Sequence, residues 1–512
     1  MSYKQNIVFN YISQFYVTII GILTFPLYIK YMGAEAYGLI GFFTMLQALF
    51  SLLDIGLTPT IARETARYLG GVTSPLNYRK LFRALSFIFL ATAILGGGIL
   101  FILSDNIATQ WLNVNKLPTN EVVLAVKIMA ICVALRWVCG LYRGVITGSE
   151  NFVWLSWFNS SIATLRFIMV LPIMMYFGFT PLVFFIHQFV VAFLEFFGLL
   201  WKGRLLLPQK NNLSQNIGFS FKPILSVLRF SLTIAFTSAL WIFVIQIDKF
   251  TLSGILTLDE YGYFTLGILV AGGIMSISGP ISKAIMPRMA RLYAEGKHEE
   301  MIKIYRSSTQ IVTVFAGTAA MTMFFCAKPI LFLWTGDINL SEKVAPILQL
   351  YAINNAILSL IAFPYYLQYA KGDIKYNLIG NFILLLILIP GVIYISPIYG
   401  GVGTGYLWVT ISILYMFTWL GYVHFKLEPG LHIQWLIKDI LAIITPAFLF
   451  GCLSFLYDFN LYNRFHNFLY ILLISLALLF FTSLSSTVMK TYIKEKTLKK
   501  KESIFKKKFF YN

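Results

Sequence analysis

The sequence has little charge for its length. Only 12% of its 512 residues are charged, whereas 58% are hydrophobic, and the mean hydropathy is +0.76. A soluble chain of this size cannot cover its surface with so few charged side chains. Lipid is the alternative solvent, and the composition therefore predicts a membrane protein.

Cysteines and the motifs of enzyme active sites are also scarce. The four cysteines, Cys132, Cys139, Cys326 and Cys452, lie in apolar runs and lack the CxxC spacing of metal or redox sites. The sequence contains no P-loop, nucleophile triad or metal-ligand pair, and the glycines of 400–405 lack the spacing of a dinucleotide-binding loop. We therefore expect no metal, no cofactor and no enzymatic activity.

Long apolar runs are what the sequence has instead. A membrane-crossing helix needs about 20 mostly apolar residues, and in lipid the backbone groups of a span find partners only within a helix. The sequence thus predicts an all-α polytopic membrane protein with about fourteen transmembrane helices. These lie near 7–30, 36–57, 80–104, 121–145, 152–177, 180–201, 224–253, 261–281, 303–328, 343–369, 374–396, 401–425, 434–457 and 466–489.

Two stretches of the chain resemble each other. Tyr37-Gly38 in the stretch 31–68 corresponds to Tyr261-Gly262 in the stretch 255–293, an offset of 261 − 37 = 224. Six spans in each half make the halves parallel repeats, because an even number of spans returns the chain to the same side. The predicted parts are a six-helix lobe at 1–205, a cytoplasmic linker at 206–223, a second lobe at 224–426, an extra helix pair at 434–489 and a basic tail at 490–512.

Basic residues indicate the orientation of the chain. Lysines and arginines concentrate in every second loop, and such loops lie in the cytoplasm. Both termini are then cytoplasmic as well. The net charge of 40 − 21 = +19 lies mostly in these loops and the tail, where it faces anionic lipid. We therefore expect membrane lipid, and no nucleic acid, as the partner of this charge.

Polar side chains within the spans are the candidate site. A charged group at mid-membrane costs at least about 2.5–3.5 kcal/mol, so it should face a cavity or a partner. Basic groups outnumber acids, and guanidinium groups fit phosphate geometry, so we expect an anionic cargo. The binding candidates are Arg136, Arg166, Lys249, Arg143, Asn159, Gln246, Asn354 and Asn355, and the structural or coupling acids are Asp248, Glu195 and Asp54.

Structural interpretations of these residues remain open at this stage. Arg136 could pair with Glu195, Asp248 and Lys249 could neutralise each other, and Arg143 could extend to the membrane surface. Asp54 lies where it could cap a helix. His187 is a weak indication of proton coupling.

The sequence resembles the polysaccharide-repeat-unit flippases (Wzx type) of the MOP exporter superfamily. The similar pieces include FPLYIKYMGAEAYGLIGFF, LLDIGLTPTIARETAR, YRGVITGSENF and PISKAIMPRMARLYAEG, and Asp248 in QIDKF matches a recurring position of the family. The resemblance implies two six-helix lobes in a V and basic cavity residues that meet a diphosphate. Many members have twelve spans, and the extra pair at 434–489 is similar to that of lipid II flippases and of spore-coat or teichuronic relatives.

The expected function is translocation of an undecaprenyl-diphosphate-linked oligosaccharide repeat unit to the outer leaflet of the bacterial cytoplasmic membrane, by alternating access. It would serve O-antigen or capsule biosynthesis, beside a polysaccharide polymerase and a chain-length regulator. One alternative is a cation-coupled, MATE-like small-molecule exporter, and another is a lipid II-type flippase. A glycan polymerase or ligase would be expected to have a large outer loop, and the sequence offers none.

Overall fold

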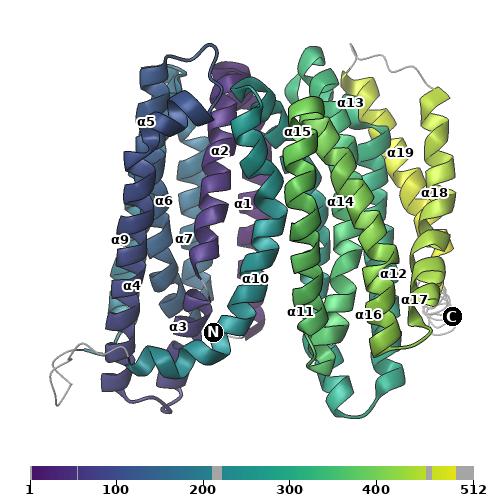
Figure 1. Ribbon diagram of the computed structural model, residues 1–512, viewed down its shortest axis with the longest axis horizontal. Coiled ribbons are helices and arrows are strands. Elements are labelled where there is room, and N and C mark those ends of the chain that lie inside the picture. Colours follow the sequence, from purple (N-terminus) through teal and green to yellow (C-terminus); the bar gives the residue numbers. More distant parts are fainter. Residues whose placement is uncertain (1–2, 55, 210–221, 457–463, 492–512) are drawn as a thin grey trace, which may run out of the picture. The chain divides into compact units, whose positions relative to one another are not determined.

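The computed structural model is built from helices, which are shown in Figure 1. It describes residues 3–54, 56–209, 222–456 and 464–491, and within these it contains no strand. The helices are α1 (Tyr3–Met32), α2 (Ala34–Ser51), α3 (Leu57–Leu69), α4 (Pro75–Ile102), α5 (Ser104–Asn106), α6 (Thr119–Gly148), α7 (Phe152–Ala163), α8 (Val170–Phe177), α9 (Pro181–Leu206), α10 (Lys222–Ile255), α11 (Leu258–Ala294), α12 (His298–Phe325), α13 (Ala327–Thr335), α14 (Ile338–Lys371), α15 (Lys375–Phe417), α16 (Trp419–Leu427), α17 (Leu431–Gln434), α18 (Ala442–Cys452) and α19 (Arg464–Ser485).

The prediction of an all-helical membrane protein is confirmed. Within the described residues, twelve helical stretches are long and apolar enough to cross a membrane. One of them, Lys375–Leu427, is 53 residues long and is broken at Gly400, whose φ of 58° and ψ of −147° are not helical. The 34-residue α10 is a further long helix outside the twelve. The count of fourteen stays a prediction.

The chain forms two compact units, Met1–Gly262 and Tyr263–Asn512. The first unit includes α10, which the sequence-based division assigns to the second lobe. A short loop around Asn113 attaches α10 to the first unit. The side-chain amide of Asn113 donates to the carbonyls of Gly254, Ile255 and Leu256, at 3.2–3.3 Å. The N–H of Leu258 donates to the Asn113 carbonyl at 2.9 Å, so this loop holds the end of α10 and the start of α11.

Glu35 at the start of α2 holds the same loop from its other side. Its carboxylate accepts hydrogen bonds from three consecutive backbone N–H groups, those of Asn115, Lys116 and Leu117. A buried carboxylate is stabilised when several such donors surround it. The loop thereby connects the N-terminal ends of α2 and α11 within the first unit.

The two Tyr-Gly motifs meet at this junction. A Cβ atom on Gly38 would lie 2.0 Å from the carbonyl oxygen of Leu258, and one on Gly262 would lie 2.4 Å from that of Ala34. The contacts are reciprocal at the repeat offset, since 258 − 34 = 224 and 262 − 38 = 224. Such reciprocity is what a local two-fold axis produces. Only glycine allows the two helix backbones to approach so closely.

Alanine at either glycine should therefore destabilise the protein. We expect Gly38→Ala and Gly262→Ala each to lower the free energy of unfolding by about 1–3 kcal/mol, because an added methyl group overlaps a backbone carbonyl. Thermal unfolding of the purified protein in detergent measures the effect. Gly98→Ala in α4 is the matched control, since a Cβ there would meet nothing within 4 Å. Equal melting temperatures for Gly38→Ala and Gly98→Ala would contradict the close contact.

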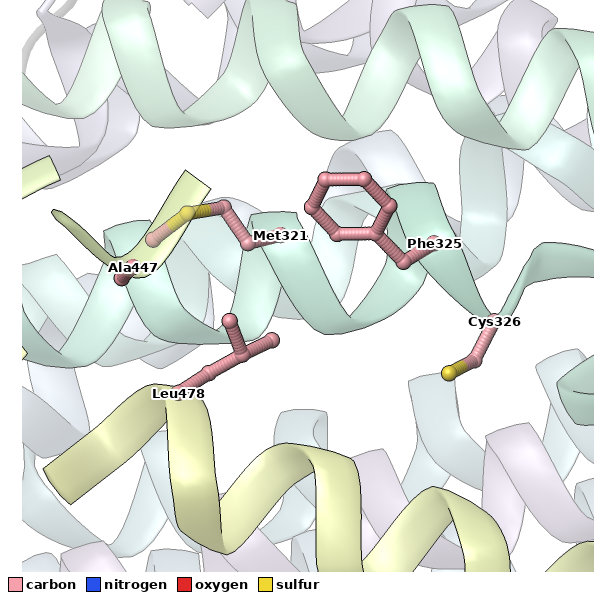
Figure 2. Close-up of a cluster of buried hydrophobic side chains, with 5 residues drawn as sticks. All are labelled: Met321, Phe325, Cys326, Ala447 and Leu478. Carbon is pink, nitrogen blue, oxygen red and sulfur yellow. The ribbon is translucent and has the colours of Figure 1, made fainter. Parts of the chain in front are cut away.

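In the second unit, α18 and α19, which the sequence-based division places in an extra helix pair, pack against α12 (Figure 1). Figure 2 shows the core of this contact, in which Met321, Phe325 and Cys326 meet Ala447 of α18 and Leu478 of α19. The hydroxyl groups of Thr318 and Thr482 share a hydrogen bond of 2.9 Å between α12 and α19. Small residues and interhelical hydrogen bonds are typical of helix packing in membranes.

Candidate functional site: an arginine cluster in the first unit

Three neighbouring helical segments of the first unit carry charged residues. α6 holds Arg136 and Arg143, seven residues apart and hence on one face. Arg166 lies in a π-helical turn, Thr164–Ile168, between α7 and α8. α9 holds Glu195, and these segments pack on one another (Figure 1). The fold therefore brings together four of the residues that the sequence singled out.

Glu195 is the centre of the cluster. Its Oε1 accepts a hydrogen bond from Nη2 of Arg143 at 2.5 Å, and its Oε2 accepts one from Nη2 of Arg166 at 2.6 Å. Nε of Arg136 lies 4.0 Å from Oε2. Hydrogen bonds between ionised groups are about twice as strong as neutral ones, so a single carboxylate holds guanidinium groups from two helical segments.

Neutral amides bind three further guanidinium nitrogens of the cluster. Nη1 and Nη2 of Arg136 donate to the side-chain oxygens of Gln47 and Gln188, at 2.6 and 3.0 Å. Nη1 of Arg143 donates to Oδ1 of Asn159 at 2.7 Å. The guanidinium of Arg136 also lies 5.1 Å from the centre of a phenylalanine ring, that of Phe43, a cation–π distance. None of these partners carries a negative charge.

The cluster consequently has a positive surplus of 3 − 1 = +2. The side chain of Glu195 is only 4% exposed, whereas those of Arg143 and Arg166 are 31% and 24% exposed. Nε of Arg136 and Nε of Arg166 are buried and have no hydrogen-bond partner among the described residues. A buried donor without a partner is unfavourable, so an anion that reached these groups would be bound strongly.

The π-helical turn at Arg166 is supported by its neighbours. The N–H of Met169 bonds to the carbonyl of Thr164, five residues back, so the turn holds one extra residue. The hydroxyl of Tyr28 donates to the Phe167 carbonyl at 2.7 Å, and the amide of Gln188 donates to the Arg166 carbonyl at 3.1 Å. Such turns are frequent at functional sites.

The candidates on α10 have polar interactions along their own helix. Nζ of Lys249 donates to the Ile245 carbonyl at 3.0 Å, and Oδ1 of Asp248 accepts from the Lys249 backbone N–H at 2.7 Å. Oε1 of Gln246 is buried with no hydrogen-bond partner in the described part of the chain. α10 thus carries polar groups of its own within the first unit.

The remaining candidates lie elsewhere. Asn354 and Asn355 are buried in α14 of the second unit, where Oδ1 of Asn354 accepts from the Ser412 hydroxyl at 2.7 Å. Asp54 accepts from the N–H of Thr58 at 2.8 Å, in the first turn of α3. His187 is buried on α9, beside Gln188.

Two residues of the cluster were absent from the sequence-based candidates. Gln47 on α2 and Gln188 on α9 both bind Arg136. Each is an amide in an otherwise apolar span, the same signal that selected Gln246 and Asn159. Gln188 also lies seven residues before Glu195, on the same helical face, and this spacing could have identified it.

A second polar network lies in the second unit. Arg306 of α12 binds the fully buried Asp439 with two hydrogen bonds of 2.7 and 3.1 Å, and Gln310 donates to the same carboxylate at 2.8 Å. A cavity of about 810 Å³ lies beside them. Its lining holds the three carboxylates of Asp439, Glu428 and Glu299 and the two cations of Arg306 and Lys303, and Glu428 is paired with Lys371 at 2.6 Å. The cavity therefore lacks the positive surplus that an anionic cargo requires.

Loss of Arg306 should destabilise the second unit. We expect Arg306→Met to lower the free energy of unfolding by about 3 kcal/mol, because Asp439 would be left buried without its cation. Lys328→Met is the control, since Lys328 forms an exposed 3.6 Å pair with Glu342 that should contribute less than about 1 kcal/mol. Thermal unfolding compares the two variants, and equal effects would contradict the buried pair's structural role.

Comparison with known proteins identifies the family. The family model described as "Polysaccharide biosynthesis protein" matches residues 3–293, which is more than half of the chain. The chain belongs to this family. The whole arginine cluster lies inside the matched region. A relative from Shigella flexneri, "Putative O-antigen transporter", is 26% identical over 152 residues, and the matched part is 30% of this chain and 35% of that protein.

Solved structures show the fold. The lipid II flippase MurJ in an inward closed conformation is similar with a TM-score of 0.69 and 15% identity, over 93% of this chain and 98% of that one. A multidrug resistance MATE family transporter of the MOP superfamily, facing inward, has a TM-score of 0.65 and 12% identity, over 81% and 96%. The chain therefore shares its fold with these two proteins, as its sequence predicted.

Proposed function

We propose that this protein is a flippase, which moves an oligosaccharide linked to undecaprenyl diphosphate from the inner to the outer leaflet of the bacterial cytoplasmic membrane by alternating access. The observation that carries the proposal is the arginine cluster with its surplus of two positive charges. Membership of a polysaccharide biosynthesis family supports the glycan part of the cargo. O-antigen or capsule synthesis is the proposed pathway.

The cargo and the cluster are chemically matched. A diphosphate diester carries about two negative charges and several acceptor oxygens, which guanidinium groups bind in pairs. Moving such a group through hydrocarbon without a partner is strongly unfavourable. The partly exposed guanidinium groups of Arg143 and Arg166 would replace the water that the diphosphate loses on entering the protein.

The membrane potential would supply the driving force. With the cell interior negative, each negative charge that moves outward gains about 2.3 kcal/mol per 100 mV. Two charges gain about 4–5 kcal/mol, which biases transport outward without nucleotide hydrolysis. Both termini are proposed to be cytoplasmic, and a polysaccharide polymerase and a chain-length regulator are proposed as partners at the outer leaflet.

Two alternatives have a specific observation in their favour. The similarity of fold to a MATE family transporter fits a cation-coupled exporter, which needs a carboxylate able to bind a cation. Of the candidate carboxylates in the first unit, however, Glu195 already binds arginines and Asp54 binds the start of α3. The third, Asp248, accepts the backbone N–H of Lys249. The similarity of fold to MurJ over 93% of this chain fits a lipid II-type cargo.

The accumulated lipid of a deletion strain tests the proposal. We expect loss of the protein to leave a complete lipid-linked repeat unit on the inner leaflet and to remove surface polysaccharide. Extraction and mass spectrometry of the lipid would identify the glycan, and accumulation of lipid II would support the second alternative. Unchanged lipid intermediates together with increased drug sensitivity would instead indicate the exporter.

A further inference from the structure

Glu195 is unusual among the residues of the arginine cluster. Its carboxylate lies within 4.0 Å of nitrogens of all three arginines, Arg136, Arg143 and Arg166. It uses both oxygens and is almost fully buried. A structural ion pair needs one arginine for one acid, whereas this acid is shared by three. Its role is therefore more than to neutralise a neighbour.

The arginines do not all depend on Glu195 for their position. Gln47 and Gln188 hold both terminal nitrogens of Arg136, and Asn159 holds one nitrogen of Arg143. These neutral acceptors orient the guanidinium groups without using their charge. Removal of the Glu195 charge would leave these amide hydrogen bonds in place and raise the net positive charge of the cluster from +2 to +3.

A carboxylate and a phosphate compete for the same donors. Both are anions that accept charge-assisted hydrogen bonds from guanidinium nitrogens. The donors that Glu195 occupies belong to Arg143 and Arg166, whose side chains are also the more exposed ones of the cluster. An incoming phosphate would thus meet the nitrogens that now bind Glu195.

We propose that Glu195 is an internal competitor of the cargo phosphate. In the empty site it occupies Arg143 and Arg166, and on binding it gives up these hydrogen bonds to the cargo. With Glu195 ionised, the cluster has a net charge of +2, which matches the charge of a diphosphate diester better than that of a monophosphate. The competition from Glu195 also keeps cargo binding weak enough for release. This inference rests on the proposed flippase function.

Glu195→Gln is the variant that tests the inference. We expect it to bind a diphosphate at least about tenfold more tightly, since one competing negative charge is gone from a site of low dielectric. Transport should nevertheless slow, because release becomes limiting. The variant should also discriminate less between diphosphate and monophosphate than the unaltered protein does.

The measurement uses the full-length protein in lipid nanodiscs. The probes are geranyl-diphosphate-linked N-acetylglucosamine and the corresponding monophosphate, with dissociation constants from calorimetry. Asp105→Asn, which alters an exposed acid in the short helix α5, is the control and should bind like the unaltered protein. Equal or weaker diphosphate binding by a stable Glu195→Gln protein would overturn the inference and leave the flippase proposal intact. Failure of the unaltered protein to bind either probe would overturn both.

A second measurement uses the unaltered protein, so it tests the inference even if Glu195→Gln does not fold. Infrared difference spectra of the unaltered protein report the hydrogen bonding of carboxylates. Addition of the diphosphate probe should shift a carboxylate band as Glu195 loses its arginine donors, whereas the monophosphate should shift it less. Diphosphate binding without any change in the carboxylate region would show that Glu195 keeps its arginines, and would overturn the inference.

Discussion

Arg166→Gln should reduce the proposed export of a lipid-linked glycan by about 10- to 100-fold. Arg166 donates to Glu195 from a π-helical turn and is partly exposed, so it is placed to bind an incoming phosphate. A hydrogen bond to a charged group contributes about 1.5–3 kcal/mol, and each 1.4 kcal/mol is a factor of ten. Surface polysaccharide in a complemented deletion strain measures the effect, together with the accumulated lipid intermediate.

The fold should tolerate this change, because Glu195 keeps Arg143 at 2.5 Å and Arg136 at 4.0 Å. Arg166→Lys retains the charge but loses the planar donor pair, and should export at an intermediate rate. Lys127→Gln is the matched control on α6, because Lys127 pairs with the exposed Asp105 outside the cluster. Full export by a normally produced Arg166→Gln protein would contradict a phosphate role for this residue.

An imposed membrane potential of 100 mV, negative on the side of cargo entry, should shift the distribution of the proposed cargo by about three orders of magnitude. The reason is the charge of the diphosphate, since two charges gain about 4–5 kcal/mol at this potential and each 1.4 kcal/mol is tenfold. Proteoliposomes with a potassium gradient and valinomycin provide the potential. The fraction of a lipid-diphosphate glycan accessible to an external enzyme measures the distribution.

The same vesicles with equal potassium on both sides are the control, and in them the cargo should distribute evenly. A MATE-like exporter would behave differently, because its transport follows a proton or sodium gradient through the coupling ion. Transport that ignores the potential but responds to such a gradient would therefore contradict the proposed mechanism and favour the alternative.

Much of the candidate site could be predicted from single residues. Arg136, Arg143, Arg166, Asn159 and Glu195 stand out because a charged or amide side chain is costly in an apolar span. The structure places these five in one cluster. The partners could not be predicted, since periodicity fixes the face of a helix but not which helix lies opposite. Lys249 and Asn354 satisfied the same criterion, yet they lie on other helices.

The sequence by itself determined the solvent, the helical class and the positions of the buried charges, because each follows from local composition and from the length that a span needs. It also contained the Tyr-Gly repeat and the resemblance to a flippase family. Only the tertiary structure decided that one carboxylate serves three arginines, that Gln47 and Gln188 hold Arg136, and that α10 belongs to the first unit. The physical reason is that helix rotation, a π-helical turn and close glycine contacts arise from packing between segments far apart in the chain.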